Sequence, residues 1–267
     1  MFKKHISQIL TLVLLGVLLS GCGEYQKLLN GSDYDLKYEK AKEYFGLEEY
    51  IRASALFEEL MAVFKGTDRS EDVFYHYAYC YYHQADYTMA GYYFRSFVGT
   101  FPNSDKAEEC AFMNAYCYYK ASPNTNLDQA NTYKAIDELQ LFVNQHPLSS
   151  RMDECNGLID ELNDKLVEKS FNSAKLYYDL GEYKASITAL NNSLKEYPET
   201  RFREELLYLI LTSSYELARN SVLAKIKERY EQAQEAYYIL VEEFPETEHL
   251  RDAERIHATV NKALQGS

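Results

Sequence analysis

The stretch AYCYY at residues 78–82 recurs unchanged at residues 115–119, thirty-seven positions further along the chain. Four of the five prolines each follow an aromatic residue or a histidine and come at the end of an apolar pattern, at Pro102, Pro147, Pro198 and Pro245. A proline cannot continue a helix, and the polar residues after it suit the start of a new helix. A recurring unit that ends on a proline therefore predicts a series of helical hairpins.

The residues before these prolines follow one spacing. Tyr87, Ala90, Phe94, Phe97 and Pro102 lie at intervals of 3, 4, 3 and 5 residues, and the same series starts again at Tyr183 and Tyr230, and at Tyr50 without a final proline. Intervals of 3 and 4 place side chains on one face of a helix, with a small residue where a neighbouring helix comes close. The spacing predicts that the second helix of each hairpin is buried along this face.

This spacing, with the turn Gly181-Glu182 before Tyr183, resembles the tetratricopeptide repeat (TPR). The sequence therefore predicts an all-α fold, an α-solenoid of five TPR hairpins at 34–66, 71–104, 107–149, 154–200 and 203–247, plus a C-terminal capping helix at 248–264. The third unit carries a loop at 122–126, and the fifth carries extra sequence around 220–227. The fourth unit begins with a long helix over 152–180.

The N-terminus predicts export and lipidation. Lys3 and Lys4 precede an apolar run at 6–19, which is too short to span a membrane and suits a signal peptide of residues 1–21. The run ends in Leu-Ser-Gly-Cys, which resembles a bacterial lipobox, so Cys22 is the expected lipidation site, with palmitate among the acyl chains. The alternative is an ordinary signal peptide in front of Cys22. Residues 22–33 are then the lipidated tether to the first repeat.

The expected location is the periplasmic side of the outer membrane. Several acyl chains on one residue give stable anchoring. Residues 23–27 contain no acidic run of the kind that some surface-exposed Gram-negative lipoproteins have after the anchor. The formal net charge of −13 becomes about −15 without the two lysines of the leader, which disfavours nucleic acid and anionic lipid as partners. Membrane attachment must therefore come from the lipid.

The sequence does not predict an enzyme, a cofactor or a metal site. It contains no GxSxG, HExxH or glycine-rich phosphate loop, and His76 and His83 are too far apart for a two-ligand zinc motif. The carboxylates are expected to be solvated on the outer faces of helices. Four further cysteines, Cys80, Cys110, Cys117 and Cys155, form no CxxC pair, so we expect buried thiols, with a structural disulfide as the alternative.

Taken together, the lipobox, five TPR units and the length of the chain resemble the BamD family, the lipoproteins of the β-barrel assembly machinery of Gram-negative outer membranes. Residues 215–221 running into 227–230 look like the type found in Bacteroidetes-like bacteria. The resemblance implies docking on the periplasmic domains of BamA, with further lipoproteins of the machinery as additional partners. It also implies that the N-terminal repeats bind the C-terminal targeting strand of unfolded outer-membrane proteins.

The first helices of TPR hairpins line the concave surface, and equivalent residues form ladders along it. Their aromatic positions predict a peptide-binding groove made of Tyr38, Phe45, Tyr75, Tyr79, Tyr82, Phe112, Tyr116 and Tyr119. Tyrosine supplies apolar area and a hydroxyl that can meet peptide groups. The alternative is that the same rings pack consecutive repeats, above all Phe112 and the equivalent Phe171. Under the same alignment, the core positions are Ala41, Ala78, Ala115 and Ala174 with Tyr44, Tyr81, Tyr118 and Tyr177.

The substrate-binding half is thus predicted at 34–149 and the BamA-docking half at 150–267. In the second half, the resemblance points to an arginine after the turn 197–200, where this chain has Arg201 and Arg203. Either could pair with a carboxylate of the partner, or be an ordinary helix-start residue paired with Glu205 or solvent. Two other functions stay open: another TPR scaffold lipoprotein of the cell envelope, and a small glycan-uptake accessory lipoprotein. The second lacks support, because such proteins have large insertions and an acidic export segment.

Overall fold

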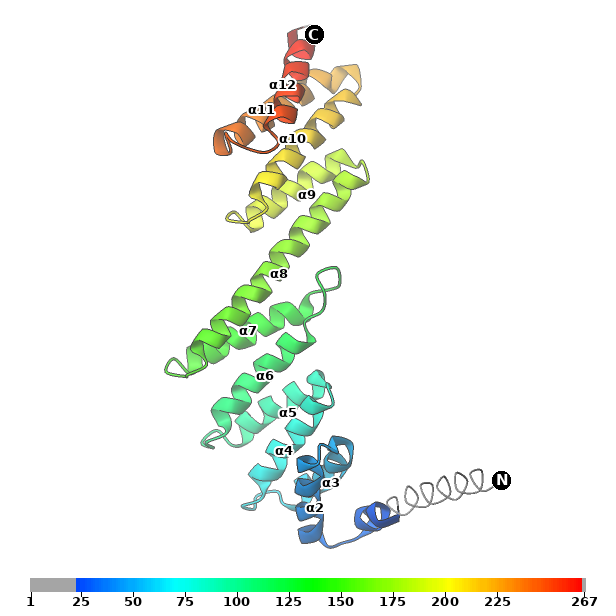
Figure 1. Ribbon diagram of the computed structural model, residues 1–267, viewed down its shortest axis with the longest axis vertical. Coiled ribbons are helices and arrows are strands. Elements are labelled where there is room, and N and C mark those ends of the chain that lie inside the picture. The colour runs from blue at the N-terminus through cyan, green and yellow to red at the C-terminus, as the bar shows by residue number, and fades with distance from the viewer. Residues whose placement is uncertain (1–22, 266–267) are drawn as a thin grey trace, which may run out of the picture. The chain divides into compact units, whose positions relative to one another are not determined.

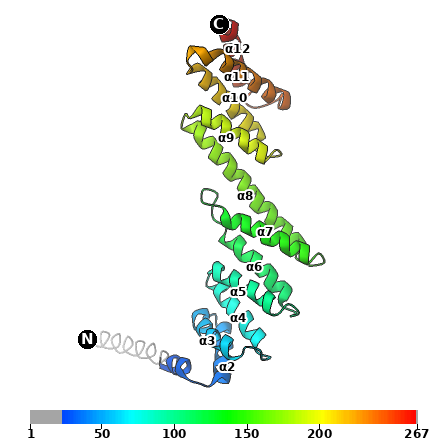
Figure 2. The same cartoon turned by 180° about the vertical axis from the view of Figure 1, so that it is seen from behind.

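The computed structural model describes residues 23–265, and their regular structure is α-helical throughout, as predicted. The expected signal peptide and Cys22 lie outside the described residues. After a helical stretch at 23–30, the helices are α2 (Tyr34–Gly46), α3 (Tyr50–Val63), α4 (Ser70–His83), α5 (Tyr87–Thr100), α6 (Ala107–Ala121), α7 (Ala130–Gln145), α8 (Met152–Asp179), α9 (Tyr183–Glu196), α10 (Arg203–Arg219), α11 (Leu223–Glu243) and α12 (Leu250–Gln265). Figures 1 and 2 show them from opposite sides.

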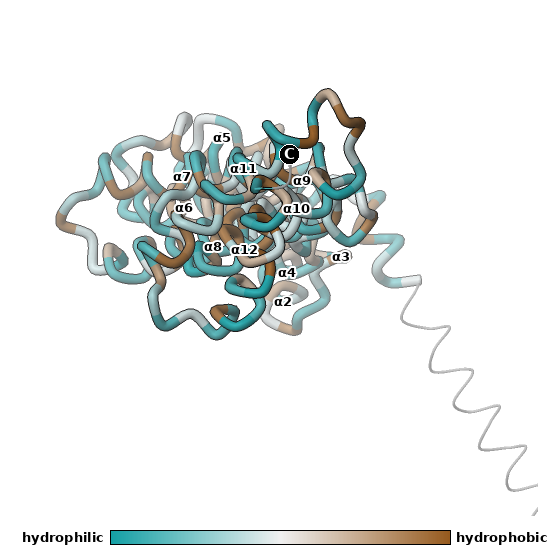
Figure 3. The backbone as a smooth tube through the Cα atoms, turned by 90° about the horizontal axis from the view of Figure 1, so that it is seen from above, coloured by the Kyte–Doolittle hydropathy of each residue, from teal (hydrophilic) through white to brown (hydrophobic). Residues whose placement is uncertain are grey.

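The chain divides into two compact units. The first holds residues 23–122 and 130–159, and the second holds residues 123–129 and 160–265, so the division falls within α8. Along the helices, hydrophobic and hydrophilic positions alternate, as amphipathic helices require (Figure 3). The first unit consists of the stretch 23–30, the hairpins α2–α3, α4–α5 and α6–α7, and the first part of α8. The second consists of the loop 123–129, the second part of α8, and α9 to α12.

The turn inside the hairpins has one geometry in three repeats. Glu48, Ala85 and Gly181 each take a positive φ, of 62°, 60° and 76°. The amide of the next residue then donates to the carbonyl of a tyrosine five positions earlier, and these bonds are 2.8 Å from Glu49, 3.0 Å from Asp86 and 2.9 Å from Glu182. Of these three turns, only that of the fourth repeat has a glycine, Gly181, the residue type best suited to a positive φ. The same turn therefore forms with or without glycine at this position, because the hairpin and its hydrogen bond are the same in all three repeats.

The face that the 3-4-3 spacing predicted is buried. Ala53, Phe57 and Leu60 on α3, and Ala90, Phe94 and Phe97 on α5, are inaccessible to solvent. The equivalent positions on α9 and α11 are buried too, except Tyr183 and Tyr237, which are half-buried. The small predicted core positions, Ala41, Ala78, Ala115 and Ala174, are also buried. Tyr177 was wrongly assigned to the core, because it is 44% exposed, whereas the equivalent Tyr44, Tyr81 and Tyr118 are half-buried.

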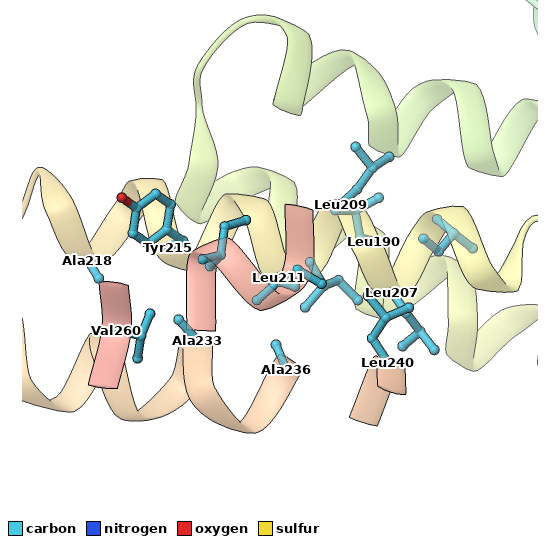
Figure 4. Close-up of a cluster of buried hydrophobic side chains, with 14 of the residues drawn as sticks. Leu190, Leu207, Leu209, Leu211, Tyr215, Ala218, Ala233, Ala236, Leu240 and Val260 are labelled. Carbon is cyan, nitrogen blue, oxygen red and sulfur yellow. The ribbon is translucent and has the colours of Figure 1, made fainter. Parts of the chain in front are cut away.

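The core of the second unit forms between α9, α10 and α11, closed by α12. Figure 4 shows Leu190 of α9, Leu211 of α10, Leu240 of α11 and Val260 of α12 gathered in this cluster. α12 lies at the predicted place of the capping helix. The loop predicted around 122–126 runs from 122 to 129, and the ammonium of Lys169 on α8 holds it through the carbonyls of Thr125 (3.1 Å) and Leu127 (2.7 Å).

The four cysteines of the described residues are free and buried, so the disulfide alternative does not hold there. Burial raises the pKa of the Cys80, Cys110 and Cys117 thiols to about 12 and that of Cys155 to about 11. Cys117 also lies where α5 approaches α6 closely, since a Cβ on Gly91 would lie 3.3 Å from its Cβ. These thiols are packing groups.

Replacing Leu240 with alanine should destabilise the second unit by about 2–5 kcal/mol, because it removes a fully buried side chain and leaves a cavity. The matched control is Ile239→Ala on the same helix, where the side chain is 44% exposed and the expected loss is about 0.5 kcal/mol. Urea unfolding of a soluble form that starts at Gly23, followed by circular dichroism, measures both. Equal losses would contradict the assigned core face of α11.

Alkylation should find all four thiols inert in the folded protein at about pH 8. The thiolate is the reactive form, and at that pH a pKa raised to about 12 leaves on the order of one thiolate in ten thousand, and about 11 for Cys155 leaves on the order of one in a thousand. Intact-mass measurement after treatment with iodoacetamide checks this, and the same sample in urea should gain four adducts. Fast labelling without urea would show that these helices are packed differently.

Candidate functional site

Six of the eight predicted groove residues form one continuous series of ring contacts over α4 and α6. The ring centroids of Tyr75 and Tyr79 are 4.8 Å apart, and those of Tyr79 and Tyr82 are 6.2 Å apart. Tyr82 then lies 6.4 Å from Tyr116 on the next hairpin. Tyr116 stacks on Tyr119 at 5.5 Å and on Phe112 at 5.5 Å. We call these six residues, with Phe45, the aromatic surface.

Phe45 joins this series through a histidine that the sequence analysis considered only as a metal ligand. The His76 ring lies 4.9 Å from Phe45 and 5.6 Å from Tyr75, and its Nδ1 is 2.7 Å from the carbonyl oxygen of Asp72. Desolvation lowers the pKa of His76, which favours the neutral ring. No sequence motif marks His76 as a packing residue. Its position between the rings of Phe45 and Tyr75 becomes apparent only from the packing of α2 against α4.

The eighth predicted residue, Tyr38, lies outside this series, in a ladder that connects consecutive repeats and shares Tyr75 and Phe112 with the aromatic surface. Tyr38, Tyr75 and Phe112 occupy equivalent positions on α2, α4 and α6, and a cation from the start of the next first helix covers each ring. Arg69 lies 4.9 Å from Tyr38, Lys106 lies 4.7 Å from Tyr75, and Arg151 lies 4.2 Å from Phe112. A cation over a ring face is attracted by about 0.5–1 kcal/mol at exposed sites and more when desolvated. These contacts favour a packing role for this ladder.

Carboxylates hold two of the tyrosine hydroxyls. The hydroxyl of Tyr38 donates to Asp72 across a distance of 2.7 Å, and that of Tyr79 donates to Glu109 on the next hairpin. Burial, followed by these hydrogen bonds, raises the pKa of both tyrosines, and burial raises the pKa of Tyr75 to about 12. The hydroxyls therefore stay protonated and serve as donors. Tyr79 also packs edge-on against the fully buried Phe94, so part of its role is structural.

The remaining members differ in exposure. Phe112 is only 2% exposed, so its ring lies in the interior between α6 and α7, where it also contacts Phe142 at 5.8 Å. Phe45, Tyr82, Tyr116 and Tyr119 are half-buried, with part of each ring facing solvent. The part of the surface that a peptide could contact thus centres on Tyr82, Tyr116 and Tyr119. The equivalent Phe171 of the second unit stacks on Phe202 at 4.3 Å.

The two predicted docking arginines have different environments in the second unit. Arg201 is 54% exposed and lies 3.3 Å from Asp164 and 3.9 Å from Glu168. It borders a cleft of about 400 Å³ lined also by Val167, Tyr197 and Pro198. Arg203 is paired with Glu243 through two nitrogens and donates to the carbonyl oxygen of Pro198 at 3.0 Å. Glu205, the partner that the sequence suggested, instead lies 3.0 Å from His249.

Sequence reasoning missed the cations at the ring faces, although the signal was present. Arg69, Lys106 and Arg151 each directly precede the first helix of a repeat, in phase with the hairpins. Within residues 23–265 no three side chains of the metal-binding types form a group that could hold an ion. In the same part of the chain, no helix combines the length and apolar character that crossing a bilayer requires.

Comparison with solved structures finds TPR proteins. One is a TPR-repeat protein from Bacteroides fragilis, 12% identical with a TM-score of 0.38, and the match covers 87% of this chain and 100% of that one. Another is the TPR2AB domain of yeast Sti1 in complex with pHSP90, 13% identical with a TM-score of 0.38, covering 86% of this chain and 99% of that one. No curated protein matches the chain. Independently of these matches, the helical hairpins of residues 34–265 and the buried face of their second helices are as the spacing predicted.

A family model described as YfiO, outer membrane lipoprotein, matches residues 32–228. This match covers four complete hairpins and the start of α11, and therefore includes the aromatic surface and both docking arginines. The assignment to the Bacteroidetes-like type stays a prediction. Because the model spans most of the chain, this protein belongs to the YfiO family of outer-membrane lipoproteins, the BamD family that its repeats and N-terminal motif resemble.

Proposed function

We propose that this protein is an assembly factor for outer-membrane β-barrels. In this proposal it is anchored by a lipid on Cys22, faces the periplasm, binds the periplasmic domains of BamA and holds the C-terminal targeting strand of an unfolded barrel protein. Membership of the outer-membrane lipoprotein family supports the location and the scaffold role. The chain acts by binding other polypeptides, with no chemical step of its own.

The observation that carries the substrate proposal is the series of rings that crosses from one hairpin to the next. Tyr79, Tyr82, Tyr116 and Tyr119 follow one another at centroid separations of 6.2, 6.4 and 5.5 Å. In an extended strand, side chains on one face repeat at about 6.6–6.8 Å. A strand laid along the rings could therefore place successive side chains of one face against successive tyrosines.

The chemistry of the substrate agrees with this surface. Strands of outer-membrane barrels alternate apolar with polar residues and carry aromatic girdles. Before it pairs with a neighbouring strand, such a strand exposes apolar side chains, which can pack on tyrosine rings. It also exposes unpaired backbone groups, which can form hydrogen bonds with tyrosine hydroxyls. The half-buried rings are already fixed by stacking, so binding would cost them little conformational entropy.

The double replacement Tyr82→Ala and Tyr116→Ala should weaken binding of a C-terminal peptide from a barrel protein by at least about tenfold, since each ring in such a contact contributes about 1 kcal/mol or more. Fluorescence anisotropy with a labelled peptide measures this. Tyr92→Ala is the control, because Tyr92 is an exposed ring on α5 outside the aromatic surface. Unchanged affinity in a double variant with native helical content would reject the groove. Tyr79 is left intact because of its bond to Glu109.

For BamA docking, Arg201 is the better candidate of the two predicted arginines. Its guanidinium is exposed beside a cleft, and its long contacts to Asp164 and Glu168 could be exchanged for a carboxylate of the partner. The two-point pair with Glu243 ties Arg203 to the end of α11.

Arg201→Glu should therefore reduce capture of purified BamA periplasmic domains, because the new carboxylate would repel the partner's. The matched control is Arg219→Glu, since both arginines are 54% exposed and both lie in the second unit. Surface plasmon resonance measures the affinity of each variant. Equal effects of the two substitutions would argue against a docking role for Arg201. Purification from membranes with other envelope proteins but without BamA would favour a different scaffold function.

A further inference from the structure

The segment that directly follows Cys22 is bound to the first hairpin. Residues 23–30 form a helical stretch whose Tyr25, Leu28 and Leu29 pack on the core between α2 and α3. The Tyr25 hydroxyl donates to the carbonyl oxygen of Arg52 at 3.0 Å, and the Tyr25 ring lies 5.5 Å edge-on from Tyr44. The guanidinium of Arg52 covers the same ring at 5.4 Å. This part of the expected tether is thus a packed element of the repeat.

A buried lysine fixes the other end of this stretch. Lys37 on α2 is almost inaccessible to solvent, and its ammonium donates to the carbonyl of Leu29 at 2.8 Å and pairs with Glu59 on α3. Glu59 is 40% exposed, but its removal would leave the buried ammonium of Lys37 without a counter-charge, which is unfavourable. Lys37 therefore holds the end of the stretch to both helices of the hairpin.

These two attachments define the direction of the stretch. Tyr25 contacts Tyr44 near the C-terminal end of α2, whereas Leu29 contacts Lys37 near its N-terminal end. The stretch therefore begins on the side of α2 that holds Tyr44 and ends beside Lys37, so it runs roughly antiparallel to α2. Cys22 precedes Gly23 by one peptide bond, so a lipid on Cys22 would be attached three residues before Tyr25, the residue that contacts both sides of the α2–α3 turn.

Two large apolar side chains are exposed at the same turn. Leu47 follows α2 and is 60% exposed, and Ile51 on the first turn of α3 is 74% exposed. Both lie next to the residues that hold Tyr25, since Leu47 is three positions after Tyr44 and Ile51 directly precedes Arg52. The beginning of the described chain and this apolar edge therefore belong to the same end of the first hairpin.

We infer that this edge, made of Leu47 and Ile51, rests in the headgroup region of the phospholipid bilayer, so that the first repeat stands on the membrane in one orientation. The inference rests on the proposed lipidation of Cys22. Apolar side chains at a membrane interface add to the binding that acyl chains provide. Two acids near this edge are paired, Glu49 with Arg52 and Glu43 with Lys40, whereas Glu48 between Leu47 and Ile51 is exposed and would stay on the aqueous side of the headgroups. The contact therefore depends on apolar insertion and needs no anionic lipid.

This orientation places one end of the aromatic surface at the membrane. Phe45 lies two positions before Leu47, and its ring contacts Tyr50 at 5.5 Å, directly beside Ile51. The series of rings then continues through His76 to α4 and on to α6. A strand bound along these rings would have one of its ends at the bilayer into which barrels are inserted.

The test uses lipidated protein purified from membranes and reconstituted in vesicles of phosphatidylethanolamine and phosphatidylglycerol. Ile51→Cys carries a nitrobenzoxadiazole fluorophore, and headgroup-labelled nitroxide phospholipid is the quencher. The native thiols outside the anchor are buried and unreactive, so labelling is selective. The matched control is Leu148→Cys, a 98% exposed position in the turn between α7 and α8 of the same unit.

We expect at least twofold stronger quenching at Ile51 than at Leu148, unchanged by high salt. Adding Tyr25→Ala and Leu28→Ala, which release the stretch from the hairpin, should remove this difference while vesicle flotation persists. Flotation with equal quenching at the two sites would overturn the membrane contact and leave the lipid anchor standing. Failure of the intact protein to float would overturn the anchor and the contact together.

Discussion

A helical hairpin of this chain cannot bury its own apolar surface, and that constraint governs the rest of the structure. The second helix of each hairpin has a fully buried face, and part of what covers it comes from the adjacent hairpin. Close approach requires small residues at fixed positions, which is why alanine or serine recurs in the spacing and why Gly91 lies against Cys117. Stability therefore comes from the contacts between neighbouring hairpins as much as from each hairpin alone.

The abundant tyrosine serves this constraint and the proposed function with the same residue type. Where a ring meets the first helix of the next repeat, as Tyr38 and Tyr75 do, a cation covers its face and an acid holds its hydroxyl or that of a neighbour. Tyr82 lies about two turns further along α4, is half-buried like Tyr38 and Tyr75, and contacts Tyr116 of the next hairpin. Because the same helices carry both positions, the packing of the repeats fixes the geometry of the candidate binding surface.

The N-terminal stretch extends the same principle to the membrane. Tyr25 and Leu29 bury apolar surface on the first hairpin in the way that a preceding helix would, and the buried ammonium of Lys37 adds a hydrogen bond to the carbonyl of Leu29. The first repeat thus has a neighbour on both sides. A lipid attached just before this stretch would be coupled to the repeat, and hence to the aromatic surface, with little freedom between them.

The sequence by itself determined the repeat, because helical periodicity and the prolines that end each unit are local signals. The small core positions, the buried 3-4-3 face and the long α8 all followed from it, and the family resemblance followed from combining the repeat with the N-terminal motif. Only the tertiary structure separated packing rings from half-exposed ones: Phe112 and Tyr116 are one helical turn apart with similar residue types, yet their neighbours α7 and α4 give them different exposure. It also decided the pairing of Arg203 with Glu243, forty residues away, and the docking of residues 23–30. Contacts of that sequence separation depend on how helices pack, which no local pattern encodes.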